Sequence, residues 1–199
     1  MEKVINKALG KASYLSINSG EVWGVGYDSM ENKEGSPMTS RERYIAAHRH
    51  YQSIQYPSAF KNFGPISTNV PDVRKANGLT QFVVNFLIWS GHRATRISSA
   101  GRVIDAPQKQ QSGISLMTKK FIPGPTRKGS ADISSTISGR SVMWEIKAGR
   151  DNPSEHQLRE QALEIKAGGL YFFTHTPDEF FEQYDSIVVS LDPNQASLL

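Results

Sequence analysis

The fold of this chain is decided by the stretch DISSTISGRSVMWEIK, residues 132–147, because it predicts a β-hairpin. If Ser138 and Gly139 form a two-residue loop, opposed residue numbers sum to 277 and Asp132 lies across from Glu145. A four-residue loop gives the same pairing. Side chains of a strand alternate between its two faces, so one face is polar and the other apolar. The polar face then holds Asp132, Ser134, Thr136, Ser141, Met143, Glu145 and Lys147, and the apolar face holds Ile133, Ile137, Val142, Trp144 and Ile146.

Two carboxylates that face each other across a strand pair are stabilised by a positive charge between them. Asp132 and Glu145 would repel each other by up to about 1 kcal/mol in water, and more strongly when buried. An oxygen-preferring cation such as Mg²⁺ or Mn²⁺ would bind them and keep waters for chemistry. Lys147 would lean toward the same site, where it could orient or deprotonate an attacking water or stabilise charge on a phosphate. Alternatively, Lys147 only neutralises Glu145 on a solvated sheet surface.

Further short motifs surround this hairpin in a particular order. They are Gly129-Ser130-Ala131-Asp132, Glu145-Ile146-Lys147, Ser154-Glu155-His156-Gln157 and Gly168-Gly169-Leu170-Tyr171. Together, over roughly residues 77–186, they resemble the PD-(D/E)XK nuclease superfamily, with the closest likeness to its VRR-NUC and phage Holliday-junction-resolvase-like branch. The resemblance implies an α/β fold with a restriction-endonuclease-like core: a helix, a mixed β-sheet with a central β-hairpin, a second helix and a further strand.

The resemblance also implies a role for each site residue. Asp132 and Glu145 would bind the metal, the main-chain carbonyl of Ile146 would complete the site, and Lys147 would serve the attacking water. Gln157 would match the supporting glutamine of the second helix. However, it lies three residues after Ser154, so a helix-capping box explains it equally well.

The first core helix departs from the pattern of this branch, which carries a glutamate there. Its counterpart is Gln81. An amide oxygen can ligate a cation but adds no charge, so metal affinity should be lower, and the number of ions stays open. Gln81 could equally be an exposed helix residue.

Positive charge is concentrated upstream of Asp132. Residues 92–131 contain eight Lys or Arg and one acid, Asp105, which gives this segment a net charge of +7. Such groups bind phosphates through counterion release, without reading sequence. DNA is therefore the expected partner, with RNA not excluded, and a solvated basic loop is the alternative. The expected contacts are Arg93, Arg96, Arg102, Lys119, Lys120, Arg127 and Lys128.

The chain has 199 residues and no cysteine, so disulfides and thiolate zinc sites play no part. Its first residues lack the apolar segment of a signal peptide, and the longest apolar stretch, 82–89, is too short to span a bilayer. We expect a soluble, intracellular protein without a membrane partner, cytoplasmic, and in the host cytoplasm if it is phage-encoded. The expected divisions are an extension of unknown role over 1–76, a nuclease core over 77–191 with a basic insertion at 101–128, and a tail over 192–199.

Local patterns predict the remaining elements. A capping box of Thr39 and Glu42 opens a helix to about residue 53, and a loop is expected over 56–71. Helices are expected over 78–90, 154–167 and 177–184, the second with Leu158, Ala162 and Ile165 facing inward. Strands are expected over 12–17, 21–27, 93–99, 170–174 and 186–191. The long segment 101–125 should form an irregular hairpin or flap over the substrate groove, fully ordered only with DNA.

These features favour a metal-dependent endonuclease that hydrolyses DNA phosphodiesters. A structure-selective or junction-resolving activity follows only from the resemblance, and a two-fold symmetric substrate would favour a homodimer. A non-catalytic nucleic-acid-binding or assembly protein on a nuclease-like scaffold is the main alternative. A hydrolase of small phosphate esters would fit the carboxylates but leave the basic segment unexplained.

Overall fold

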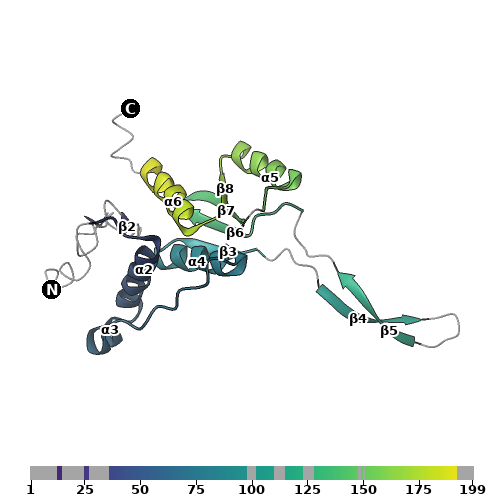
Figure 1. The fold of residues 1–199 in the computed structure, drawn as a ribbon, viewed down its shortest axis with the longest axis horizontal. Coiled ribbons are helices and arrows are strands. Elements are labelled where there is room, and N and C mark those ends of the chain that lie inside the picture. Colours follow the sequence, from purple (N-terminus) through teal and green to yellow (C-terminus); the bar gives the residue numbers. More distant parts are fainter. Residues whose placement is uncertain are drawn as a thin grey trace.

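The computed structural model is a mixed α/β fold built on a four-stranded sheet (Figure 1). It describes residues 13–14, 25–26, 36–97, 102–109, 115–122, 128–147, 149 and 151–191. The strands lie in the order β3-β6-β7-β8, antiparallel except for the parallel pair of β7 and β8. Their bounds are β3 Arg93–Arg96, β6 Ile133–Ile137, β7 Arg140–Ile146 and β8 Leu170–Thr174.

Strands β6 and β7 form the hairpin predicted from the sequence. Ser138 and Gly139 form its two-residue loop with φ of 46° and 84°, the left-handed conformation that such a tight turn requires. Ile133 pairs with Trp144, so the predicted register is confirmed. Burial alternates along β6, whose first, third and fifth residues are buried. The division into a polar and an apolar face is therefore confirmed as well.

The apolar face of the sheet packs against α4 (Ala76–Trp89) and α6 (Pro177–Leu191). Trp144 is fully buried there, with its ring 5.1 Å from that of Phe180. Its indole N–H donates to Ser135 Oγ at 2.8 Å, which satisfies the polar group of this large side chain. Helix α2 (Ser40–Gln55) begins at the predicted capping box and adds Tyr44 to the same core.

The polar face is covered by α5 (Glu155–Lys166), which follows β7 and leads into β8. Figure 1 shows α4 and α5 on opposite sides of the strands. The contacts of α5 with the sheet are polar: Ser141 Oγ donates to Glu164 at 2.7 Å, and Gln161 donates to the Tyr171 carbonyl at 3.1 Å. The predicted inward stripe is wrong, because its three residues, Leu158, Ala162 and Ile165, are all exposed.

Two further predictions are corrected. The strand expected over 186–191 is the last part of α6, because Ile187 falls on the buried stripe of Phe180 and Tyr184 at helical spacing. The loop expected over 56–71 contains a short helix, α3 (Pro57–Phe63), with Pro57 in its first turn. Proline is well suited to that position since its missing N–H would have no intrahelical partner.

The basic insertion contains a regular hairpin, with eight residue pairs between β4 (Arg102–Lys109) and β5 (Ser115–Ile122). The expected irregular form is thus corrected, while its expected response to DNA stays a prediction. The two strands pair with each other and not with the four-stranded sheet. A further pair, β1 (Ser13–Tyr14) and β2 (Val25–Gly26), lies within the two N-terminal strands that the sequence predicts.

Within the described ranges, no helix combines the length and the apolar character needed to cross a bilayer.

A buried histidine makes the stability of this core sensitive to acid. Burial lowers the pKa of His92 from 6.5 to about 4, and its Nε2 lies 2.9 Å from the Tyr184 hydroxyl. The unfolded chain takes up this proton below pH 6.5, whereas the folded chain does so only near pH 4. Stability from this group is therefore lost as the pH falls from 6.5 to 4.

We expect the wild type to lose up to about 2 kcal/mol more stability between pH 7.5 and pH 5 than His92→Gln does. Urea unfolding of both proteins at pH 7.5 and pH 5 measures it. The informative quantity is the difference between the two proteins in free energy of unfolding, because other groups titrate in the same pH range in both. Parallel pH profiles would contradict the prediction.

Candidate active site

Asp132 and Glu145 lie at the same end of the sheet, on neighbouring strands. Asp132 directly precedes β6, and its main-chain carbonyl accepts a hydrogen bond from the Ile97 N–H at 2.7 Å. Its Oδ2 accepts from the Ile146 N–H at 3.0 Å, which ties the carboxylate to the end of β7. Glu145 is the next-to-last residue of β7 and only 5% exposed. The structure therefore brings the two predicted carboxylates together across the hairpin.

Lys147 is buried beside them, with 3% of its surface exposed. Its Nζ donates to Gln157 Oε1 at 2.9 Å and to Asp151 Oδ2 at 3.1 Å, and lies 3.5 Å from Glu145 Oε1. This excludes the alternative of a solvated surface pair for Lys147. A lysine has three N–H donors, and these three oxygens already surround the Lys147 ammonium.

Gln157 connects Glu145 with Lys147. Its Nε2 donates to Glu145 Oε1, and its Oε1 accepts from Lys147. The same Oε1 accepts from the Ser154 N–H at 2.8 Å, which completes the capping box of α5. The two interpretations of Gln157 drawn from the sequence are therefore compatible: one side chain starts the helix and contacts the charged cluster.

The charge on Glu145 is unfavourable in this setting. Burial, followed by the neighbouring Asp132 carboxylate, raises its pKa from 4.5 to about 7, against the opposing effect of Lys147. Burial and the same two carboxylates also raise the pKa of the Tyr171 phenol. Near neutral pH a second cation beside these groups would therefore be favourable.

The donors present fit a divalent cation of the Mg²⁺ class. Glu145 Oε2 is buried and has no hydrogen-bond partner, a costly arrangement for a carboxylate oxygen. Mg²⁺ is commonly held by one or two carboxylates together with water and substrate oxygens. Asp132, Glu145 and the Ile146 carbonyl would supply this set. Among the described residues, no group of three or more His, Cys, Asp or Glu side chains is placed to hold a metal.

Gly129 fixes the approach to Asp132. Its φ is +87°, and a Cβ added there would lie 2.5 Å from the main-chain carbonyl carbon and oxygen of His156, in the first turn of α5. The chain leading to Asp132 therefore packs directly on the helix that carries Gln157. Only glycine combines this close approach with a positive φ.

We expect Gly129→Ala to destabilise the fold by more than the about 1–2 kcal/mol of a left-handed alanine alone. Gly139→Ala is the matched control, since Gly139 has φ of +84° but nothing within 4 Å of the added Cβ. The difference between their free energies of unfolding measures the close packing on α5. Equal losses of stability in the two variants would show that the contact between residue 129 and α5 adjusts to the added methyl group without cost.

Gln81 is placed apart from this cluster. Its side chain is exposed and lines a separate pocket between α4 and Arg96, and neither carboxylate lines that pocket. Among the described residues, none forms a hydrogen bond with its amide.

The basic residues predicted to bind nucleic acid are distributed over three parts of the chain. Arg93 and Arg96 lie on β3, and Lys128 lies three residues before Ala131 in the segment leading to Asp132. All three are exposed. Arg102, Lys119 and Lys120 belong to the β4–β5 hairpin, while Arg127 lies outside the described residues.

Asp151 and Tyr171 are two site residues that the sequence did not reveal. Asp151 forms an ion pair with Lys147, four residues earlier. This short spacing in the sequence is the one feature that could have pointed to Asp151. Tyr171 lies opposite Met143 in the parallel register and therefore on the polar face. Its hydroxyl donates to the Gly129 carbonyl at 3.4 Å, a weak link between β8 and the approach to Asp132.

No protein-family model matches the chain, and no curated protein matches it either.

Proposed function

We propose that this chain is a Mg²⁺- or Mn²⁺-dependent endonuclease that hydrolyses phosphodiester bonds in DNA. The observation that carries the proposal is the buried Glu145, with Oε2 unpartnered, between Asp132 and a buried Lys147. A structural ion pair needs only one carboxylate for one lysine. The second carboxylate, Asp132, raises the pKa of Glu145 and so opposes that ion pair, and perturbed groups of this kind are typical of functional sites.

The order of elements supports the same proposal. Apart from the inserted β4–β5 pair, helix α4, strand β3, the β6–β7 hairpin, helix α5 and strand β8 follow one another as in the restriction-endonuclease-like core that the sequence resembles. We propose that the chain has this fold, with the charged cluster at the position of the PD-(D/E)XK site. Junction-resolving activity, with a homodimer on a symmetric substrate, is a further part of the proposal that rests on the resemblance alone.

In this mechanism each side chain has a defined task. Asp132, Glu145 and the Ile146 carbonyl would hold the cation, which would polarise the scissile phosphate and lower the pKa of a bound water. Lys147 would turn one N–H from the exposed Asp151 toward the attacking water or a phosphate oxygen, and its charge would stabilise the negative charge that builds up. Gln157 fixes Lys147 and Glu145 in relation to each other. Water attacks phosphorus, the opposite P–O bond breaks, and the leaving oxygen takes up a proton.

The direct test is cleavage of branched and linear DNA with Mg²⁺ or Mn²⁺. The wild-type protein should cut and Asp132→Ala should not. Glu182→Ala, which removes an exposed acid of α6, should cut as the wild type does. Metal-dependent cleavage that is unchanged in Asp132→Ala would end the assignment.

A non-catalytic nucleic-acid-binding protein on the same scaffold is the second candidate. The observation that favours it is the exposed Gln81, an amide at the position where the resemblance expects a metal-binding glutamate. DNA binding in EDTA without turnover in either metal would decide for it.

A further inference from the structure

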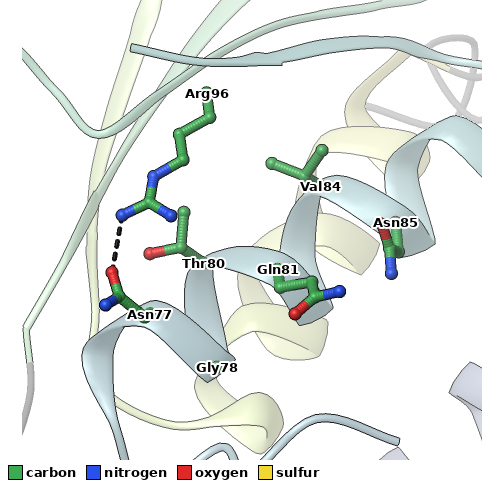
Figure 2. A pocket seen from close by; sticks show the side chains of 7 residues that line it. All are labelled: Asn77, Gly78, Thr80, Gln81, Val84, Asn85 and Arg96. Atoms are coloured by element: carbon green, nitrogen blue, oxygen red, sulfur yellow. Dashed lines mark hydrogen bonds between the residues drawn. The ribbon is translucent and has the colours of Figure 1, made fainter. Parts of the chain in front are cut away.

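A pocket outside the candidate active site lies at the same end of the sheet. It has a volume of about 380 Å³ and is formed by α4 and the end of β3 (Figure 2). This volume falls within the roughly 300–1,000 Å³ of small-molecule sites. Its polar and apolar lining includes Asn77, Thr80, Gln81, Val84, Asn85 and Arg96.

The lining of this pocket combines one cation with several amides and no acid. Arg96 reaches from β3 toward α4, where its Nη2 donates to Asn77 Oδ1 at 2.6 Å (Figure 2). Asn85 donates through its amide nitrogen to the Tyr44 hydroxyl at 3.1 Å, which leaves its carbonyl oxygen as an acceptor. Guanidinium groups bind phosphate, and side-chain amides match the donor and acceptor edges of bases.

The pocket adjoins Asp132 through the main chain. Arg96 pairs with Ile133, and the next residue, Ile97, donates its N–H to the Asp132 carbonyl. Neighbouring strands lie about 4.8 Å apart. Arg96 shares the α4 face of the sheet with Ile133, whereas Asp132 lies on the α5 face. The pocket and the carboxylates therefore lie on opposite faces at the same end of the sheet, and a nucleic-acid strand must pass around this end to reach both.

We propose that the pocket binds one nucleotide of the substrate strand, next to the bond that is cut. Arg96 holds its phosphate, and the amides of Asn77, Gln81 and Asn85 contact the edge of its base, which is unstacked from its neighbours. The substrate class rests on the proposed function. In this proposal Gln81 is a substrate-binding residue. The pocket also gives the protein a preference for nucleotides whose bases are not paired, which the carboxylates alone cannot provide.

The first test measures binding without metal. A fluorescein-labelled single-stranded oligonucleotide is titrated in EDTA, so cleavage plays no part. Arg96→Ala should weaken binding about tenfold, the effect of one charge-assisted hydrogen bond. Arg49→Ala, an exposed arginine of α2 outside the pocket, removes the same charge and should weaken it less than about twofold. Equal losses in both variants would overturn the proposal.

Asn77→Asp provides a second variant that keeps Arg96 in place. The new carboxylate forms an ion pair with the guanidinium and repels phosphate, so binding should weaken while the melting temperature is kept. Unchanged binding by Asn77→Asp would also overturn the proposal.

The second test separates a nucleotide site from a phosphate site. Deoxyadenosine monophosphate and inorganic phosphate are titrated separately while NMR follows the side-chain amides of Asn77, Gln81 and Asn85. Both ligands should shift Asn77, which is bonded to Arg96. Larger shifts of Gln81 and Asn85 with the nucleotide than with phosphate support the proposal, and no shifts of these two, or equal shifts with both ligands, overturn it.

These tests also distinguish the pocket from the nuclease proposal. If the pocket variants lose binding but the wild type never cleaves DNA, the pocket is supported and the nuclease assignment fails. If the wild type cleaves and the pocket variants bind and cleave normally, the pocket proposal fails alone.

Discussion

Lys147→Met is expected to reduce DNA cleavage by about 10²–10⁴ and to destabilise the metal-free protein by about 3–5 kcal/mol. The lysine is buried against Glu145, Asp151 and Gln157, and methionine fills a similar volume without the charge. Its loss leaves a buried carboxylate without compensation. Single-turnover cleavage and urea unfolding in EDTA measure the two effects, with Lys166→Met, an exposed lysine of α5, as the control.

A second substitution keeps this prediction testable if Lys147→Met does not fold. The double variant Glu145→Gln with Lys147→Met removes both buried charges and should recover a large part of the stability, because an uncompensated charge is costlier than a neutral pair. It should remain inactive. Full cleavage by either variant would contradict the catalytic role of Lys147. If the double variant were no more stable than Lys147→Met, the pairing of Lys147 with Glu145 would be contradicted.

The central hairpin could be predicted because its information is local. Ser138 and Gly139 fix the turn, the turn fixes the register, and alternation then assigns each residue to a face. The opposition of Asp132 and Glu145 follows from this without knowledge of the remaining chain. In the same way, Thr39 and Glu42 fix the start of α2 through contacts within one turn.

The orientation of α5 could not be predicted, because it depends on what the helix packs against. Leu158, Ala162 and Ile165 have the spacing of a buried stripe, and such a stripe normally faces a core. Here the helix covers the polar face of the sheet, where Gln161 and Glu164 find hydrogen-bond partners. The outcome is a helix with polar contacts inward and apolar residues outward.

The same dependence on packing explains which site residues were missed. Tyr171 reaches the polar face only through the parallel pairing of β8 with β7, and Gly129 approaches His156 only when α5 is docked. The end of α6 was misread for a related reason. Ile187 and Val188 are β-branched and favour strands in isolation, but they extend the buried helical stripe that begins at Phe180.

Glu145→Gln is expected to stabilise the metal-free protein above pH 7 and to abolish cleavage. Glutamate in the unfolded chain ionises near pH 4.5, whereas in the folded chain its pKa is about 7. The folded state holds the extra proton between these values, so stability falls as the pH rises through this range and stays reduced above it. A neutral amide removes the penalty. The amide also loses the attraction to Lys147, which limits the gain to about 1–2 kcal/mol.

Thermal unfolding in EDTA at pH 5 and pH 8 measures this effect, and the gap between variant and wild type should be wider at pH 8. Glu164→Gln, at a half-buried helix position that accepts a hydrogen bond from Ser141, serves as the control. With Mn²⁺ added at pH 8 the order should reverse, because the cation stabilises only the protein that keeps both carboxylates. In that case Glu145 lowers the stability of the metal-free protein, and bound metal restores it. Such a cost in stability is typical of a functional residue. If Glu145→Gln were less stable than the wild type at both pH values, Glu145 would be a structural partner of Lys147, and the case for a metal site would be lost.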